Sequence, residues 1–215
     1  NTAGKSPLEG KGGVKGIINI GKGKEIMQYP LPEIIGNPDL LVGREKEFGL
    51  LDKWIGLIPN RMAKSRALLA RRKSGKTAIV QRIFNRLWSE NGQVIPFYIN
   101  IPERNIWFPN FAVSFYCTFA SQYISFLERD PGPVRFPLTM EQIREYGVSK
   151  SMNHFVIDVD AMLNYRKNRD FDLLWQTASS APNRYVTLSD QQRILVIIDE
   201  FQNTGEYVYR DEECR

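Results

Sequence analysis

The sequence feature that most constrains the fold is an uninterrupted apolar run at residues 194–198. It reads Ile-Leu-Val-Ile-Ile, and four of its five residues are β-branched. A run of this kind is typical of a parallel strand buried on both faces, because crossover helices cover both sides of such a sheet. We therefore expect residues 194–198 to form a buried strand of an α/β protein.

Upstream of this run, segments with helical periodicity alternate with short apolar segments. The predicted elements are, in chain order, a helix over residues 48–58 that ends before Pro59, a strand over residues 67–70, a helix from Lys76 to about Asn91 and Gly92, and a strand over residues 94–101. Strands that alternate with helices indicate a layered α/β sheet.

The segment from about residue 105 to 190 is expected to be mostly helical, with breaks at residues 131–133 (Pro-Gly-Pro) and around Pro182. No charged residue occurs from Asn105 to Leu127, a stretch long enough to span a membrane. Polar residues nevertheless recur along it at helical spacing, namely Ser114, Thr118, Ser121, Gln122 and Ser125. We interpret the stretch as a buried helix with one polar stripe, and not as a membrane span.

The first 38 residues differ from the rest of the chain in composition. Residues 1–24 hold five lysines and one acidic residue, whereas the whole chain has 29 basic and 24 acidic residues. We expect a basic arm with a weak hairpin (residues 17–20 and 26–29), then a proline-containing linker that ends at residue 38. Residues 39–215 would form the single domain. The arm is either a solvated terminus or a contact to phosphate backbones or acidic membranes.

Cysteine and histidine usage excludes several classes of protein. The 215 residues include two widely separated cysteines, Cys117 and Cys214, which fits a reducing cytosol and a cytoplasmic protein without disulfides. The single histidine, His154, excludes a multi-histidine metal centre and argues against a Ser-His-Asp hydrolase.

Residues 70–77 carry the first chemical motif. They approach the pattern Gly-x-x-x-x-Gly-Lys-Ser/Thr, which binds phosphate groups between a strand and a helix. The predicted strand precedes these residues and the predicted helix follows them. The residues expected to bind phosphate are Ala70, Arg71, Arg72, Lys73, Ser74, Gly75, Lys76, Thr77 and Ala78.

The residue types of this loop suit a nucleotide with Mg²⁺. Successive backbone N–H groups and the helix N-terminus form a nest for an anion, and Gly75 permits a close backbone approach. Lys76 would reach the β- and γ-phosphates, and the Thr77 hydroxyl group would bind Mg²⁺. The three basic residues before Ser74 either assist phosphate binding or are solvated residues of the loop. Ala70 departs from the glycine of the pattern, so affinity falls if that position needs a positive φ.

Two carboxylates, Asp199 and Glu200, directly follow the apolar run. The carboxyl ends of parallel strands are where α/β proteins bind ligands. Asp199 is expected to hold Mg²⁺ through water, and Glu200 to polarise an attacking water as the general base. Residues 155–158 offer a competing acidic strand end, but their apolar pattern continues at helical steps, which favours a core helix.

With these motifs located, the chain resembles the AAA+-like P-loop ATPases of the signal-transducing (STAND) class, specifically the archaeal-ATPase-like family. Residues 41–48 resemble the Gly-Arg-Glu segment that lies near the adenine. Residues 68–77 resemble the arginine-rich phosphate loop, and residues 194–202 resemble the acidic strand. The likeness spans residues 39–205.

The resemblance implies a P-loop NTPase fold (ASCE/AAA+-like), a parallel sheet flanked by helices with a helical insertion before the acidic strand. It implies ATP and Mg²⁺ as cofactors, and switching or slow hydrolysis coupled to further domains of the same protein. It also places Val42 and Gly43 near the adenine. Asn100 would be a polar switch residue at the end of the second strand, and the alternative is an ordinary turn-forming asparagine.

The family's later strands, sensor residue and helical lid have no counterpart in the sequence. We therefore expect a domain that is incomplete at its C-terminal side and has unpaired strand edges. Two other functions stay open: a DNA-associated ATPase, on account of the basic arm, and a nucleotide-binding scaffold without hydrolysis, on account of Ala70. A homo-oligomer is also possible, and no membrane partner is expected.

Overall fold

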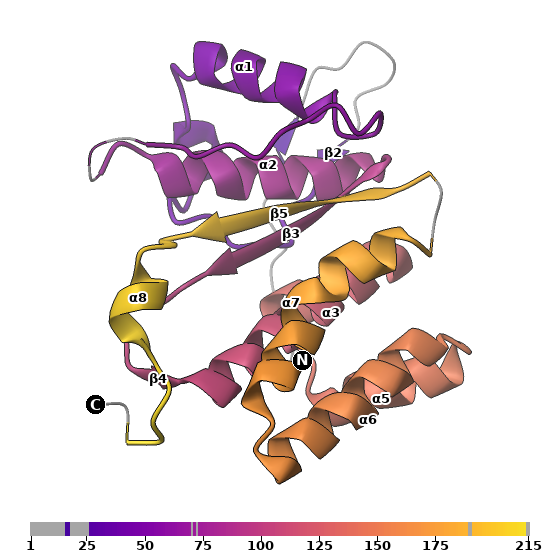
Figure 1. The fold of residues 1–215 in the computed structure, drawn as a ribbon. Coiled ribbons are helices and arrows are strands. Elements are labelled where there is room, and N and C mark those ends of the chain that lie inside the picture. Colours follow the sequence, from indigo (N-terminus) through magenta and orange to yellow (C-terminus); the bar gives the residue numbers. More distant parts are fainter. Residues whose placement is uncertain (1–15, 18–25, 70, 72, 189–190, 214–215) are drawn as a thin grey trace, which may run out of the picture.

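The computed structural model describes residues 16–17, 26–69, 71, 73–188 and 191–213. Within them the protein is mixed α/β, with parallel strands between layers of helices (Figure 1). The elements are β1 (Gly16–Ile17), β2 (Ile26–Met27), a 3-10 helix (Pro38–Leu40), α1 (Glu45–Ile55), α2 (Lys76–Glu90), β3 (Val94–Asn100), β4 (Ile106–Trp107), α3 (Phe108–Glu128), α4 (Gly132–Arg135), α5 (Met140–Ser149), α6 (Asn153–Asn168), α7 (Phe171–Val186), β5 (Arg193–Asp199), α8 (Asn203–Tyr207) and β6 (Val208–Tyr209).

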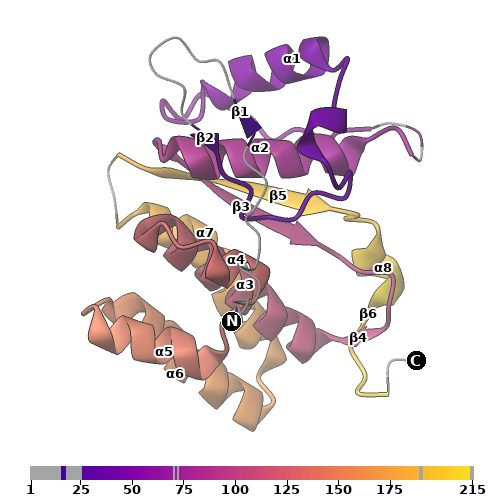
Figure 2. The same cartoon turned by 180° about the vertical axis from the view of Figure 1, so that it is seen from behind.

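Two parallel strands, β3 and β5, lie at the centre of these layers. Their register places Val94 beside Arg193 and Asn100 beside Asp199. Helices α2 and α1 lie on one side of the pair, and α3 and α7 lie on the other, with α5 and α6 farther out (Figures 1 and 2). The predicted α/β class and the predicted strand over residues 94–101 are therefore confirmed.

The two faces of β3 enter different cores. Ile95, Phe97 and Ile99 belong to the larger core, which α3 and α7 complete. Val94 and, from β5, Leu195 pack in a smaller core beneath α1 and α2. Burial on both faces explains why residues 94–99 are uniformly apolar or aromatic.

Helices α1 and α2 form where the sequence predicts them. α1 ends at Ile55, four residues before Pro59. α2 ends at Glu90, and Asn91 adopts the left-handed conformation (φ +48°) that closes a helix C-terminus. Their contact is apolar and is made by Leu51, Ile55, Ile79, Ile83 and Leu87.

Helix α3 is the buried helix that the sequence predicts. Its polar residues Ser121, Gln122 and Ser125 are buried and find partners inside the protein. The Ser125 hydroxyl oxygen, for example, accepts a hydrogen bond from Trp88 Nε1 at 3.1 Å. Among the described residues, no helix is both long enough and apolar enough to cross a membrane.

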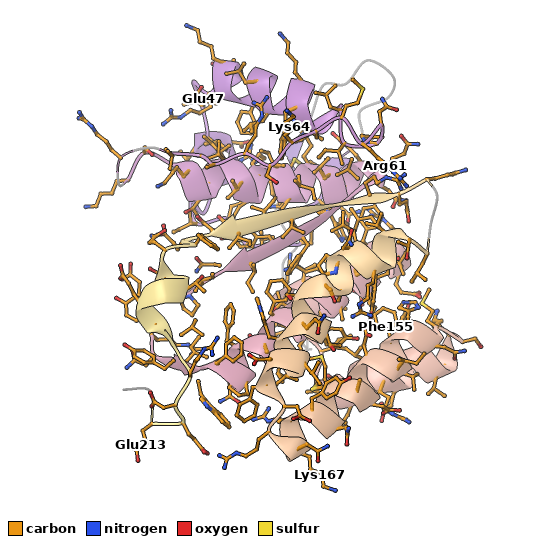
Figure 3. All side chains as sticks on the ribbon, in the orientation of Figure 1. Glu47, Arg61, Lys64, Phe155, Lys167 and Glu213 are labelled. Carbon is orange, nitrogen blue, oxygen red and sulfur yellow. The ribbon has the colours of Figure 1, made fainter. Side chains whose placement is uncertain are left out.

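Residues 155–158 lie in α6, which confirms the core-helix prediction for this segment. Phe155 is fully buried among the helices of this layer, whereas Lys167 points away from it (Figure 3). The Asp158 carboxylate is also buried, and it accepts hydrogen bonds from Arg184 at 2.6 and 3.0 Å and from the Tyr185 hydroxyl group at 2.9 Å. The acidic residue therefore joins α6 to α7.

The strand predicted over residues 67–70 is wrong for the part that the structure describes. Residues 67–69 are irregular, Leu69 is 91% exposed, and Ala70 lies outside the described residues. A strand must pair its N–H and C=O groups with a neighbour. No described strand pairs with this segment, so its local apolar pattern does not produce one.

The helix break predicted around Pro182 is also wrong, because Pro182 lies inside α7. Proline removes one N–H donor from a helix and disturbs the preceding turn. Here the neighbouring side chains Ala178, Ala181 and Tyr185 are buried in the larger core. We infer that this packing outweighs the lost hydrogen bond. The break predicted at residues 131–133 is confirmed, since α3 ends before it.

Strand β5 forms as predicted but is not buried on both faces. Val196 and Ile198 are 40% and 41% exposed. The reason is that β3 is the one described strand that pairs with β5. No described strand lies along the other edge of β5 to cover these side chains.

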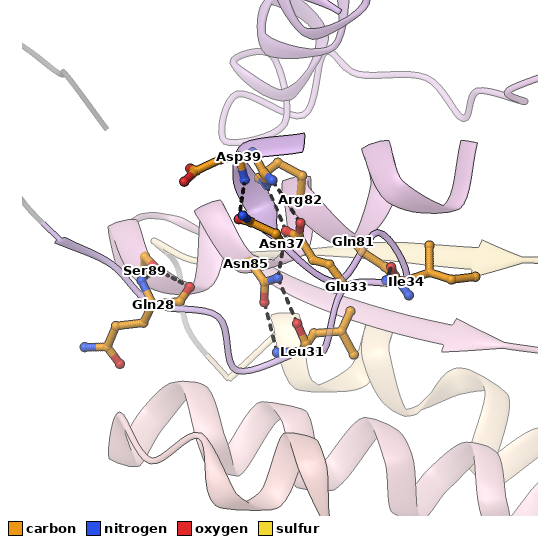
Figure 4. Close-up of polar contacts among 10 residues, drawn as sticks. All are labelled: Gln28, Leu31, Glu33, Ile34, Asn37, Asp39, Gln81, Arg82, Asn85 and Ser89. Carbon is orange, nitrogen blue, oxygen red and sulfur yellow. Dashed lines mark hydrogen bonds and ion pairs between the residues drawn. The ribbon is translucent and has the colours of Figure 1, made fainter. Parts of the chain in front are cut away.

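The linker lies along α2 (Figure 4). The Asn85 side chain accepts a hydrogen bond from Leu31 N–H and donates one to the Leu31 carbonyl oxygen, both at 2.9 Å. Glu33 accepts hydrogen bonds from Arg82 at 2.8 and 2.9 Å. These contacts attach residues 31–33 to the helix that follows the phosphate-loop motif.

The predicted N-terminal hairpin is confirmed only where the structure describes it. Gly16 and Ile17 pair antiparallel with Met27 and Ile26. The rest of the basic arm, residues 1–15 and 18–25, lies outside the described residues, as does Cys214.

Candidate phosphate-binding site

The segment before α2 has an alternating backbone conformation. Lys73 and Gly75 have positive φ angles of +61° and +83°, whereas Ser74 between them does not. Ser74 N–H donates to the Arg71 carbonyl oxygen at 3.3 Å, which closes a tight turn. Residues that alternate between left- and right-handed conformations turn successive N–H groups toward one side, which makes a concave site for an anion.

Helix α2 begins at Lys76, immediately after this turn. The first N–H groups of a helix have no partner within the helix, and they carry its positive dipole end. The Ser74 hydroxyl oxygen is buried and has no hydrogen-bond partner among the described residues. Lys76 and Thr77 are half-buried at the same place. The site thus combines backbone donors, one orphaned hydroxyl group and a lysine.

Arg44 holds this turn from a distant part of the chain. Its Nη2 donates to the Ser74 carbonyl oxygen at 2.7 Å, and its Nη1 donates to Glu47 at 2.9 Å. The hydrogen bond from Arg44 lowers the pKa of the Glu47 carboxyl group. Arg44 lies in the Gly-Arg-Glu segment of the sequence but was not predicted as a site residue, because a contact across 30 positions leaves no local pattern.

The acidic strand end lies at the carboxyl end of β5. Asp199 is the last residue of the strand, and its Oδ2 accepts a hydrogen bond from the Tyr98 hydroxyl group at 3.2 Å. Burial and the negative charge of Asp199 raise the pKa of Tyr98, so the hydroxyl group stays protonated and donates. Asn100, the predicted switch residue, is beside Asp199 in the strand register and is exposed.

A side chain of α2 lies close to this strand end. The Gln81 side chain is near the Tyr98 hydroxyl group that donates to Asp199, and it opposes the rise in the pKa of Tyr98. Gln81 Oε1 also accepts from Ile34 N–H of the linker at 2.7 Å. Gln81 comes five residues after Lys76, so the first turns of α2 are held beside the acidic end of β5. Gln81 and Tyr98 were not predicted from the sequence, since each is also an ordinary helix or strand residue.

Glu200 adopts a left-handed conformation, with φ +53°. This conformation costs a residue other than glycine about 1 kcal/mol. Glu200 N–H donates to Asp199 Oδ1 at 3.1 Å, and its carboxylate accepts a hydrogen bond from the Gln202 side chain. Strain of this kind often occurs at functional sites, where the surrounding structure holds the side chain in place.

For the other predicted site residues, the structure gives only their exposure or their backbone conformation. Ala70 and Arg72 lie outside the described residues. Arg71 and Lys73 are exposed, and Ala78 is buried in α2. Val42 is exposed, whereas Gly43 adopts φ +71°, which favours glycine.

The donor set fits a hard cation that also binds a phosphate ligand. A hydroxyl oxygen from Thr77 and a carboxylate oxygen from Asp199 are the ligand types that Mg²⁺ takes alongside water and phosphate oxygens. The described residues contain no group of three or more His, Cys, Asp or Glu side chains that could hold a metal ion by themselves. A site of this composition would therefore need the phosphate ligand to complete it.

A comparison of the chain with protein-family models, curated proteins and solved structures finds no match. The functional argument consequently depends on the residues and geometry described above.

Proposed function

We propose that this chain binds Mg-ATP as the nucleotide-binding part of a P-loop ATPase. The observation that carries the proposal is the alternating backbone of Lys73, Ser74 and Gly75 at the start of α2. The acidic strand end supports it as well: Tyr98 bonds Asp199, and Gln81 of α2 lies near Tyr98. A phosphate-binding turn and an acidic strand end are the two parts that nucleotide hydrolysis requires.

Each residue would have a distinct task in binding. The N–H groups of Gly75, Lys76 and Thr77 would donate to phosphate oxygens, and the Lys76 ammonium group would neutralise the β- and γ-phosphates. Thr77 and Asp199 would hold Mg²⁺, Asp199 through a water molecule. Arg44 would keep the turn in its binding conformation, because it bonds the Ser74 carbonyl oxygen.

Glu200 would act in hydrolysis as the general base. Its carboxylate would accept a proton from the water that attacks the γ-phosphorus atom. The bond from that atom to the β–γ bridging oxygen would break, ADP would leave, and Lys76 and the loop N–H groups would stabilise the charge that develops on the phosphates. The contact from Gln202 orients the Glu200 side chain before the nucleotide binds.

The finer assignment, to the AAA+-like ATPases of the STAND class, rests on the same residues in their chain order. The Gly-Arg-Glu segment precedes the turn, and its Arg44 reaches that turn. The parallel pairing of β3 with the acidic strand β5 also agrees with a P-loop NTPase sheet. Such a fold would require residues 67–69, which are irregular here, to form the strand that precedes the phosphate loop.

Titration with ATP in the presence of Mg²⁺, followed by calorimetry, tests the proposal. Lys76→Ala should weaken binding at least about tenfold, which corresponds to ~1.4 kcal/mol. Lys167→Ala is the matched control, because it removes the same charge from the exposed surface of α6. Absence of ATP binding by the folded wild-type protein, or equal affinity of Lys76→Ala, would contradict the site.

Hydrolysis is tested separately from binding. Glu200→Gln should keep Mg-ATP binding and lower the turnover of a measurable ATPase activity by at least about a hundredfold, as expected for loss of a general base. An unchanged turnover would remove Glu200 from the mechanism. Binding without any turnover in the wild-type protein would favour the nucleotide-dependent scaffold.

A further inference from the structure

Residues 28–34 form a strap that lies along α2 (Figure 4). On the helix side, the contact is made by residues four positions apart, which share one face of the helix over three successive turns: Gln81, Asn85 and Ser89. Gln28 N–H donates to the Ser89 hydroxyl oxygen at 2.9 Å, and that hydroxyl group donates to the Gln28 carbonyl oxygen at 3.0 Å. The strap is thus hydrogen-bonded to α2 from Gln81 to Ser89.

A buried charge fixes the position of the strap on the helix. The Glu33 side chain is 1% exposed, and its carboxylate accepts hydrogen bonds from Arg82 at 2.8 and 2.9 Å and from Asn85 at 3.1 Å. A carboxylate is rarely buried unless it is paired and hydrogen-bonded, because desolvation opposes its charged form. Movement of the strap by one residue would separate Glu33 from these donors, so the docked position is specific.

The last contact of the strap reaches the residues beside the acidic strand end. Gln81 is buried, and its Oε1 accepts a hydrogen bond from Ile34 N–H at 2.7 Å. The same side chain lies near the Tyr98 hydroxyl group and opposes the rise in the pKa of Tyr98. An N–H donor has this effect on a phenol oxygen, because it stabilises the deprotonated form. The strap therefore occupies the oxygen atom of the Gln81 amide and leaves its NH₂ group to face Tyr98.

The orientation of the Gln81 amide determines whether Tyr98 keeps its bond to Asp199. A hydroxyl group has a single hydrogen atom, and Tyr98 donates it to Asp199 Oδ2 at 3.2 Å. An NH₂ group beside the hydroxyl oxygen cannot accept this hydrogen atom, so the bond to Asp199 is kept. If the amide turned, its oxygen atom would compete with Asp199 for the same hydrogen atom. Release of the strap from Gln81 permits that turn.

We propose that docking of the strap on α2 and binding of Mg-ATP favour each other, with Gln81 as the positioning residue that connects them through Tyr98. The inference rests on the proposed function, since Asp199 is the residue assigned there to Mg²⁺. The docked strap keeps Tyr98 bonded to Asp199 and so keeps the carboxylate oriented for the metal ion. Because coupling between two binding events is reciprocal, bound Mg-ATP stabilises the docked strap by the same factor. Displacement of the strap then lowers the affinity for Mg-ATP, which makes residues 28–34 a regulatory element of the site.

Ile34→Pro tests the contact between the strap and Gln81. Ile34 is the second residue of a β-turn in which Gly36 N–H donates to the Glu33 carbonyl oxygen at 2.9 Å. Proline suits this position, so the substitution keeps the turn and removes the N–H group that donates to Gln81. Ile34→Ala is the matched control, because it keeps that N–H group and loses only an exposed side chain. In calorimetry with Mg²⁺, Ile34→Pro should bind ATP at least about fivefold more weakly than Ile34→Ala, and the two should be equal when the metal is chelated.

A double-mutant cycle tests whether Gln81 acts through Tyr98. Gln81→Leu should also weaken Mg-ATP binding at least about fivefold in the wild-type background. In the Tyr98→Phe background it should change the affinity by less than about twofold, because the hydroxyl group that Gln81 positions is absent. A merely structural role for Gln81 would give the same loss in both backgrounds, and that result would overturn the proposal.

Hydrogen exchange in the wild-type chain measures the reciprocal effect and does not depend on the folding of a variant. Saturating Mg-ATP should slow exchange of the Leu31 N–H group at least about fivefold more than exchange of the Lys150 N–H group. The Lys150 group is the control because it bonds the Tyr146 carbonyl oxygen at the end of α5, in the outer layer of helices. ATP with a chelator should give no such difference, and equal slowing of the two groups by Mg-ATP would overturn the proposal.

Comparison with Lys76→Ala distinguishes failure of the strap proposal from failure of the proposed function. If the wild-type chain binds Mg-ATP and Lys76→Ala weakens that binding, but Ile34→Pro equals Ile34→Ala, the strap is not coupled to the site and this proposal alone is overturned. If the folded wild-type chain binds no ATP, both proposals are overturned together.

Discussion

The Tyr98 hydroxyl group donates a hydrogen bond to the Asp199 carboxylate across strands β3 and β5, at 3.2 Å. The two residues are 101 positions apart in the chain. Gln81 of α2 lies near the same hydroxyl group, so the contact between Tyr98 and Asp199 is made next to α2. It holds the Asp199 side chain in one orientation before any ligand binds.

Tyr98→Phe should therefore weaken Mg-dependent ATP binding at least about tenfold, since one hydrogen bond to a charged carboxylate contributes about 1.5 kcal/mol or more. The expected loss appears in calorimetry with Mg²⁺ and is smaller when the metal is chelated. Tyr146→Phe is the matched control, because its hydroxyl group bonds Glu128 on the far layer of helices. Equal losses for the two variants would show that Tyr98 does not position Asp199.

Gly75→Ala should destabilise the protein by about 1–2 kcal/mol, because alanine adopts the left-handed conformation at that cost. The effect comes from the positive φ angle and not from a steric clash, since the nearest atom to an added Cβ is Arg44 Nη2 at 3.8 Å. Gly49→Ala, inside α1 with no atom within 4 Å of the added Cβ, should stabilise by about 0.4–1 kcal/mol. Urea unfolding of both variants measures the difference, and a neutral Gly75→Ala would contradict the strained turn.

Asn85→Ala should destabilise the protein by about 2 kcal/mol, because it leaves partly buried main-chain groups of Leu31 without partners. Asn85 is fully buried, and it also donates to Glu33 at 3.1 Å. Asn168→Ala, at the exposed end of α6, should change the free energy of unfolding by less than about 0.5 kcal/mol. If the two variants are equally stable in urea, the linker does not stabilise α2.

Acid should lower the stability of the protein through His154. Burial lowers the pKa of His154, the nearby Asp158 carboxylate opposes that shift, and Arg184 reinforces it. The unfolded chain therefore takes up the proton first, so this contribution is complete above about pH 6.5 and is lost as the pH falls below that value.

The measurement for His154 is the free energy of unfolding at several pH values. His154→Phe should flatten its decline between about pH 6.5 and 5. At lower pH the variant and the wild type should lose stability together, because carboxyl groups with lowered pKa values, such as Asp160 beside Arg144, then take up protons. If the free energy of unfolding changes with pH at the same rate in both proteins near pH 6, His154 titrates in the folded state as it does in the unfolded chain.

Local patterns predicted most of the helices and both long strands. The apolar steps of α1 and α2, the turn at Asn91 and the buried stretch of α3 are determined by neighbours in the chain. The site predictions made from the sequence remain predictions. The structure adds that Tyr98 bonds Asp199 and that Gln81 of α2 lies near Tyr98.

The failures share one physical cause. Residues 67–69 look like a strand, but strand formation depends on a partner that the local sequence does not contain. Pro182 looks like a helix break, but the core around α7 stabilises the helix through it. Val196 and Ile198 look buried on both faces, but their exposure depends on which strands pair with β5.

The sequence by itself determined where helices begin and end, which residues are apolar on each strand, and which residue types could bind phosphate and Mg²⁺. Hydrophobic periodicity, residues that end helices and side-chain chemistry are local properties, so a single sequence carries them. Only the tertiary structure decided that Arg44 holds the turn at Ser74 and that Tyr98 holds Asp199. It also decided that, among the described strands, β5 pairs with β3 alone, because hydrogen bonds between residues far apart in the chain depend on how the elements pack.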